Sequence, residues 1–351
     1  MIFSRLAKDS SLFLAWRSSV KIWLEDDPCE RAKTLYNQLR EFKPPRWLND
    51  IDVSLEKAFA GQGELFQQLK EWGGQQLDSS ADDADTYNLR ILLPALCFSF
   101  LKIKNSILQN KKSQRRGLED IIEFAFGVGK GNFNILYESS IRLRESPEVA
   151  VCPNAIVDTL VTFPVTNLKG KPVKPDDLLK TAEFTVVRNA WWSPDPRADI
   201  SVIVFPSEYK RPDLDTNCNQ VIIDFCTTQS QRRTLGAEDD IIFGMAAARG
   251  EAVIYSCWWE GDEMFYAKHE AWMLTDPRQF IGFYVFLCNL ANHARKSLQT
   301  MFTSYQANDR VTALTTHLWR APDHPPKQTY ERSRLSSDGS GDDRQAGGSG
   351  D

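Results

Sequence analysis

The sequence predicts an α+β protein with an α/β core: a helical N-terminal region at residues 1–118, then a mixed sheet flanked by helices at residues 119–320. Two observations predict this class. In the N-terminal region, apolar residues recur at three- and four-residue spacing, as in amphipathic helices. Further along the chain, short runs rich in β-branched residues alternate with helical patterns, which is the order expected of a sheet covered by helices.

Three segments of the N-terminal region have the helical spacing. They are "ERAKTLYNQLREF" at 30–42, "SLEKAFAGQGELFQQLKEW" at 54–72 and "NLRILLPALCFSFLKIKNSILQ" at 88–109. The third is strongly apolar, so it predicts a core helix. This region contains no catalytic pattern.

The following region contains the predicted strands. "VVRNAWW" at 186–192 and "ISVIVFPSEYK" at 200–210 indicate strands, and the helical "NCNQVIIDFCTTQSQRR" at 217–233 follows with Asp215 or Thr216 as N-cap. Arg249-Gly250 and Gly261-Asp262 then separate three further runs, which predicts an antiparallel meander. A final long helix begins with Asp276 as N-cap and Pro277 in its first position.

Composition limits the function classes. Hydrophobic residues make up 42% and charged residues 25%, and the net charge of −5 argues against a surface coated with Lys and Arg for non-specific nucleic-acid binding. No apolar run approaches the ~18 residues of a membrane span, and no signal peptide is evident, so we expect an intracellular protein of the nucleus or cytoplasm without membrane contact. Residues 321–351 are almost devoid of apolar side chains, which predicts a disordered tail.

Glu208 and Lys210 stand out at the end of the apolar run "ADISVIVFPSEYK". Successive side chains of a strand point to opposite faces, so these two point the same way. A solvated ion pair is the ordinary explanation of such a pair. However, another acid, Glu183, lies in the upstream run "TAEFTVVRN", and a helix containing Gln220 follows within ten residues.

The order strand, acid, strand, ExK, helix resembles the PD-(D/E)XK nuclease superfamily, whose members have a restriction-endonuclease-like fold. More narrowly, "ADISVIVFPSEYKRP", "QVIIDFCTTQSQRR", "DDIIFGMAAARGEAVIYSCWW" and "DPRQFIGFYVFLCNL" resemble the nuclease-like region of fungal proteins with a fungal-type protein kinase domain. The similarity covers roughly residues 120–300. No HRD, DFG or APE motif of a kinase occurs.

The resemblance implies a Mg²⁺- or Mn²⁺-dependent nuclease acting on DNA. It makes Glu208 a metal ligand, Lys210 the residue that assists the attacking water, and Gln220 a helical residue near the site. Carboxylates suit this role because hard divalent cations prefer oxygen ligands. The alternative is an inactive nuclease fold that binds a protein partner or nucleic acid.

The identity of the first metal-binding acid stays open. Members usually have Pro-Asp there, whereas this chain has Ala182-Glu183 on the favoured strand. Asp199 is a rival, although nine residues before Glu208 leave little room for two strands and a turn. The two Pro-Asp pairs, at 175–176 and 194–195, lie in turn-like stretches.

Two further features have both an ordinary and a functional interpretation. A basic stretch containing Lys111, Lys112, Arg115 and Arg116 is either a solvated loop or a contact for backbone phosphates. Glu138, in "NILYESSIRL", is predicted on a helix before the strands, where some nucleases place an extra acid. A surface carboxylate is the ordinary interpretation.

Overall fold

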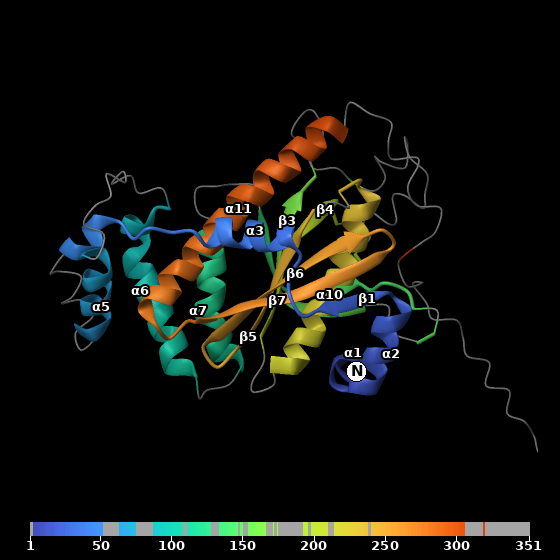
Figure 1. Ribbon diagram of the computed structural model, residues 1–351, viewed down its shortest axis with the longest axis horizontal. Coiled ribbons are helices and arrows are strands. Elements are labelled where there is room, and N and C mark those ends of the chain that lie inside the picture. The colour runs from blue at the N-terminus through green and yellow to red at the C-terminus, as the bar shows by residue number, and fades with distance from the viewer. Residues whose placement is uncertain are drawn as a thin grey trace, which may run out of the picture.

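The computed structural model shows a mixed sheet between two layers of helices (Figure 1). The residues that it describes are 3–51, 63–74, 87–107, 111–127, 133–146, 148–149, 154–165, 171, 174, 192–195, 198–209, 214–237, 240–305 and 319.

The sheet contains seven strands in the order β1-β7-β6-β5-β4-β3-β2. Their bounds are β1 Ile22–Glu25, β2 Asn134–Arg142, β3 Asn154–Pro164, β4 Ser201–Tyr209, β5 Ile242–Ala248, β6 Glu251–Glu260 and β7 Glu263–Met273. β4 pairs with β3 in antiparallel and with β5 in parallel orientation, and β1 pairs in parallel with β7. β4 is buried along its whole length, which explains why it reads as a nearly continuous apolar run.

Helices cover both faces of the sheet. Their bounds are α1 Phe3–Lys8, α2 Ser10–Ser19, α3 Glu30–Arg40, the 3₁₀ helix η1 Arg46–Asp50, α5 Gly63–Gly74, α6 Leu89–Ser106, α7 Lys111–Ile122, the π-helix η2 Glu123–Gly127, α10 Leu214–Thr234 and α11 Pro277–Tyr305. One apolar core joins α3, α5, α6, α7 and α11 to the sheet, and a second joins α1, α2 and α10 to its other face. Among the described helices, none is both long enough and apolar enough to cross a membrane.

Polar side chains of α10 hold this helix along β4. Gln231 donates from Nε2 to the Ser201 carbonyl at 2.7 Å and accepts from the Ile203 amide at 3.1 Å. At the other end of the helix, Asn217 donates to the carbonyl of Ala247, at 3.0 Å, and Ala247 pairs with Tyr209. The helix is thereby fixed at both ends of β4, so the end of β4 that follows Glu208 has a defined position.

The α+β class and most of the C-terminal elements were predicted correctly. The run at 200–210 forms β4, the helical pattern at 217–233 lies within α10, and the three runs after it form the antiparallel meander β5–β6–β7. α11 begins at Pro277, and the Arg278 and Gln279 amides donate to Asp276 Oδ1 at 3.0 and 2.9 Å. Asp276 is therefore the predicted N-cap.

Four local predictions were wrong. The region expected to be helical contains the strand β1, and Glu138 lies on strand β2 rather than on a helix. The basic stretch forms helix α7 rather than a loop, and α10 begins at Leu214, so Asp215 and Thr216 lie inside the helix. The predicted strand at 186–192, apart from its last residue, and the predicted tail at 321–351 lie outside the described residues.

His269 on β7 predicts a specific acid sensitivity. Its ring is buried, stacks on Tyr36 with ring centroids 4.0 Å apart and lies 2.9 Å from Ser256 Oγ. Burial lowers the pKa of His269 from 6.5 to about 4, so the folded state disfavours its protonation. The resulting stability is fully present above pH 6.5 and is lost as the pH falls toward 4, by about 3 kcal/mol.

Urea unfolding between pH 7.5 and 4.5 tests this expectation. His269→Gln should flatten the loss of stability over this pH range relative to the wild type, because the glutamine does not titrate. An unchanged pH dependence in the variant would assign the acid sensitivity to other groups.

Candidate active site

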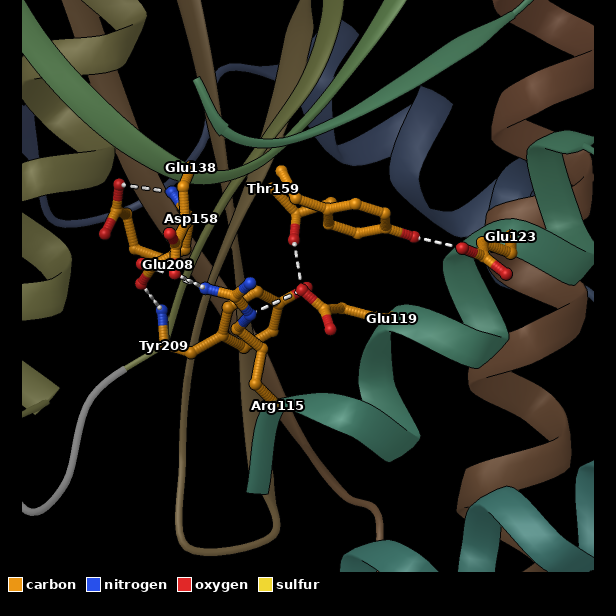
Figure 2. A network of polar contacts seen from close by, with 9 residues as sticks. Arg115, Glu119, Glu123, Glu138, Asp158, Thr159, Glu208 and Tyr209 are labelled. Carbon is orange, nitrogen blue, oxygen red and sulfur yellow. Dashed lines mark hydrogen bonds and ion pairs between the residues drawn. The ribbon is translucent and has the colours of Figure 1, made fainter. Parts of the chain in front are cut away.

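Two buried carboxylates, Asp158 on β3 and Glu208 on β4, lie side by side where the two strands end their pairing (Figure 2). The pairing of β3 with β4 runs as far as Thr159 opposite Ser207, so the next residue of each strand is one of these two acids. Asp158 is 5% exposed and Glu208 1% exposed. Charged groups at this depth need specific partners.

Each carboxylate accepts a backbone hydrogen bond from the other's strand. The Tyr209 amide donates to Asp158 Oδ2 at 2.9 Å, and the Asp158 amide donates to Glu208 Oε1 at 3.4 Å. The side chains thus satisfy amides at the point where the ladder stops. These contacts fix both carboxylates beside one another where the pairing of β3 with β4 stops.

Arg115 of α7 reaches into the same cluster. Its guanidinium forms an ion pair with Glu119 through Nε, and its Nη1 lies 3.1 Å from Glu138 Oε1 and 3.7 Å from Asp158 Oδ1. Figure 2 shows these acids converging on the Arg115 side chain from α7, β2 and β3. One cation therefore contacts carboxylates from three elements of the fold.

The backbone of β2 is irregular at the residue that meets Arg115. Glu138 has a φ of 49°, in the left-handed region that few residues other than glycine adopt. The pairing passes from Tyr137 opposite Thr159 to Ser139 opposite Val157 and thus skips Glu138 and Asp158. Such an interruption re-aims side chains relative to a regular strand. The Glu138 side chain remains 71% exposed.

Glu119 of α7 connects this helix to β3 next to the cluster. The Thr159 hydroxyl donates to Glu119 Oε1 at 3.4 Å. Burial raises the pKa of the Glu119 carboxyl, and Arg115 and Thr159 act in the opposite direction. Burial lowers the pKa of Arg115, but its acidic neighbours outweigh that effect and raise the pKa overall. Arg115 is therefore a permanent cation among these acids.

The candidates for the first metal-binding acid lie in different parts of the chain relative to Glu208. Asp199 is exposed and precedes β4, nine residues or about 30 Å of strand away from Glu208, so its assignment to the site was wrong. Asp195 of the second Pro-Asp pair is exposed and precedes the same end of β4, in a turn closed by the Ala198 amide. Glu183 and the first Pro-Asp pair lie outside the described residues.

The strand predicted to contain Glu183 lies outside the described residues, so the expectation that it flanks the strand of Glu208 stays a prediction. The neighbours of β4 in the sheet are β3 and β5, and Asp158 of β3 takes the position beside Glu208. The sequence analysis missed Asp158. A signal was present, because "AIVDTLVTF" at 155–163 is a run of mainly β-branched residues that contains a single acid.

The other predicted site residues have different outcomes. Gln220 is buried on α10, one turn after Asn217, which holds the end of β5 beside Tyr209. Lys210 directly follows β4 and lies outside the described residues.

The predicted phosphate-contact patch is not a uniform basic surface. The Arg115 side chain is 14% exposed and forms ion pairs with acids of the site, so it does not belong to an open basic surface, and its predicted contact with phosphate stays a prediction. Arg116 is exposed on α7, whereas the side chains of Lys111 and Lys112 lie outside the described part of the structure.

Asp158 and Glu208 offer a limited but suitable donor set for a hard cation. Mg²⁺ retains several waters and is commonly held by one or two carboxylates together with substrate phosphate oxygens. The described residues contain no group of three or more His, Cys, Asp or Glu side chains that could hold a metal ion. The pair therefore fits a metal shared with substrate and water, and it does not fit a closed structural metal site.

Comparison with known proteins leaves the family open. A scan against protein-family models gives no match, and a search of curated proteins finds no similar sequence.

Proposed function

We propose that this protein is a metal-dependent nuclease of PD-(D/E)XK type that hydrolyses phosphodiester bonds of DNA. The observation that carries the proposal is the side-by-side placement of the Asp158 and Glu208 carboxylates on two adjacent strands, at the point where β4 stops pairing with β3. In this assignment the two carboxylates would hold Mg²⁺ or Mn²⁺, and Lys210 follows Glu208 by two residues in the sequence.

The order of elements supports the same assignment. β3 carries Asp158, β4 carries Glu208, and α10 follows β4 directly. This is the order strand, acid, strand, ExK, helix that the sequence resemblance implies, with Asp158 rather than Glu183 as the first acid. The usual Asp is therefore present in this position, although no proline precedes it.

The residues of the chain have separate roles in this reaction. Asp158 and Glu208 would hold and orient the cation, and a divalent cation bound there would lower the pKa of a water ligand and neutralise charge on the phosphate. The backbone hydrogen bonds described above keep both carboxylates in place before substrate arrives. Lys210 adds positive charge next to the phosphate and orients the attacking water.

Cleavage of supercoiled and linear DNA tests the proposal. The purified protein should nick DNA with Mg²⁺ or Mn²⁺ and should be inactive in EDTA. Lys210→Ala should lower the rate by a factor of ~10² because a charge is lost at a phosphoryl-transfer site. Tyr209→Phe is the matched control, since it keeps the backbone amide that donates to Asp158. If the wild type cleaves DNA no faster than Lys210→Ala with either metal, the proposal that the protein is a nuclease is rejected.

A second candidate function is favoured by the position of Arg115. A guanidinium already neutralises Asp158 and its neighbours, as expected of a nuclease fold that has kept its acids for structure and binds DNA or a protein without cleaving it. The two functions differ in one measurement. The binding module would retain DNA in a gel-shift assay while showing no metal-dependent cleavage.

A further inference from the structure

The Arg115 guanidinium forms an ion pair with Asp158 and reaches it from α7, outside the sheet. Its three contacts are unequal. Glu119, four residues along α7, and Glu138 on β2 hold the guanidinium closely, whereas Asp158 Oδ1 lies 3.7 Å from Nη1. The contact with Asp158 is the longest of the three, and hence the one given up at least cost.

A divalent cation held by Asp158 and Glu208 would compete with this contact. A metal ion and a guanidinium at the same carboxylate repel one another, and the site is too buried for water to screen that repulsion fully. Arg115 can release Asp158 without leaving its other two partners, because Glu119 and Glu138 belong to α7 and β2 and not to the pair of acids on β3 and β4.

We propose that Arg115 is the internal counter-cation of this acid cluster and that it sets the metal affinity of the site by competing with the divalent cation for Asp158. The proposal rests on the proposed function, because it takes Asp158 and Glu208 as the metal-holding pair. It assigns Arg115 a role in regulating that pair, in place of the phosphate contact expected from the sequence.

Calorimetric titration of the metal-free full-length protein with Mn²⁺, without DNA, tests the competition. Arg115→Gln should bind Mn²⁺ roughly tenfold more tightly than the wild type, the change that corresponds to about 1.4 kcal/mol of lost competition. Arg116→Gln removes the same charge from an exposed neighbouring position on α7 and should alter the affinity by about twofold at most. Asp158→Asn should abolish the Mn²⁺ binding that the wild type and the two arginine variants have in common.

Stability measurements give a second readout. Without metal, Arg115→Gln should unfold at a lower temperature than the wild type, because the carboxylates lose their counter-cation. Added Mn²⁺ should stabilise the variant more than the wild type, since stabilisation grows with affinity. If Arg115→Gln does not fold, Arg115→Lys replaces it. The lysine keeps the positive charge but lacks the planar guanidinium that can contact two carboxylates at once. We therefore expect its affinity for Mn²⁺ to lie between that of the wild type and that of a site without a competing cation.

The outcomes separate this inference from the proposed function. If Mn²⁺ binds the wild type and the Arg115 variants equally tightly, or binds the variants more weakly, the competition is overturned and the metal site stands. If neither the wild type nor the variants bind Mn²⁺ in a manner that depends on Asp158, the metal site fails and the competition fails with it.

Discussion

Asp158→Asn is expected to reduce metal-dependent DNA cleavage by a factor of roughly 10²–10³, the effect of removing one charge-stabilising group at a reacting phosphate. The amide is nearly isosteric with the carboxylate, and its oxygen can still accept the hydrogen bond from the Tyr209 amide. The fold should therefore persist, which circular dichroism and thermal unfolding can verify. Initial rates of nicking with saturating Mg²⁺ and Mn²⁺ give the comparison.

Two variants make this result specific. Glu208→Gln should lose activity to a similar extent, because it removes the second carboxylate of the pair. Asp199→Asn should cleave at the wild-type rate, because Asp199 lies at the opposite end of β4. The assignment would be wrong if Asp158→Asn kept its activity while Asp199→Asn lost it.

Gly117→Val is expected to lower stability by about 1–3 kcal/mol, or to displace α7 from its position. A Cβ atom at Gly117 would lie 2.7 Å from Ile103 Cγ1 and 2.7 Å from the Ser99 carbonyl oxygen, so α6 and α7 cannot keep their present separation. Nearby, Asp120 of α7 accepts hydrogen bonds from Ser99 and Lys102 of α6. These contacts require the same close approach of the two helices.

This substitution should also disturb the candidate site, because Gly117 lies between Arg115 and Glu119 on α7 and a shift of the helix would move both side chains. Thermal unfolding followed by circular dichroism measures the first effect, with an expected fall of roughly 3–12 °C. Gly63→Ala on α5 is the matched control. No atom lies within 4 Å of a Cβ there, so its melting temperature should be unchanged or slightly raised. Equal melting temperatures for wild type and Gly117→Val would show that the helices can separate without cost.

The parts of the fold that the sequence predicted are those with local signals. β4 is a long β-branched run, the meander has glycine turns at both connections, and α11 has Asp276 and Pro277 at its start. Each of these signals acts over a few residues, so no knowledge of the rest of the chain is needed to interpret it. Glu208 was identified for the same reason.

Asp158 was missed because the chain between its strand and β4 is long. β3 ends at Pro164 and β4 begins at Ser201, whereas adjacent antiparallel strands are usually joined by a few residues. The acids that the sequence indicates as partners of Glu208 are therefore those close to it along the chain. Register, which brings Asp158 to Glu208, depends on pairing between distant segments and cannot be read from either strand alone.

The role of Arg115 was equally hidden. In the sequence it belongs to a run of basic residues, and such runs usually indicate a solvated surface or an anion contact. Its acidic partners come from one turn along its own helix and from two strands, Glu138 on β2 and Asp158 on β3. Only the tertiary arrangement of α7 against the sheet reveals that this one arginine faces inward.

The parallel pairing of β1 with β7 has a consequence for folding during synthesis. Ile22 pairs with Met264, so β1 leaves the ribosome roughly 240 residues before its partner, an interval on the order of 10–50 s at typical elongation rates. Trp16 and Ile22, which are fully buried in the finished protein, must remain without their final cover during this time. The nascent N-terminal segment therefore exposes apolar side chains until β7 has been synthesised. We expect chaperones to bind this segment during that time.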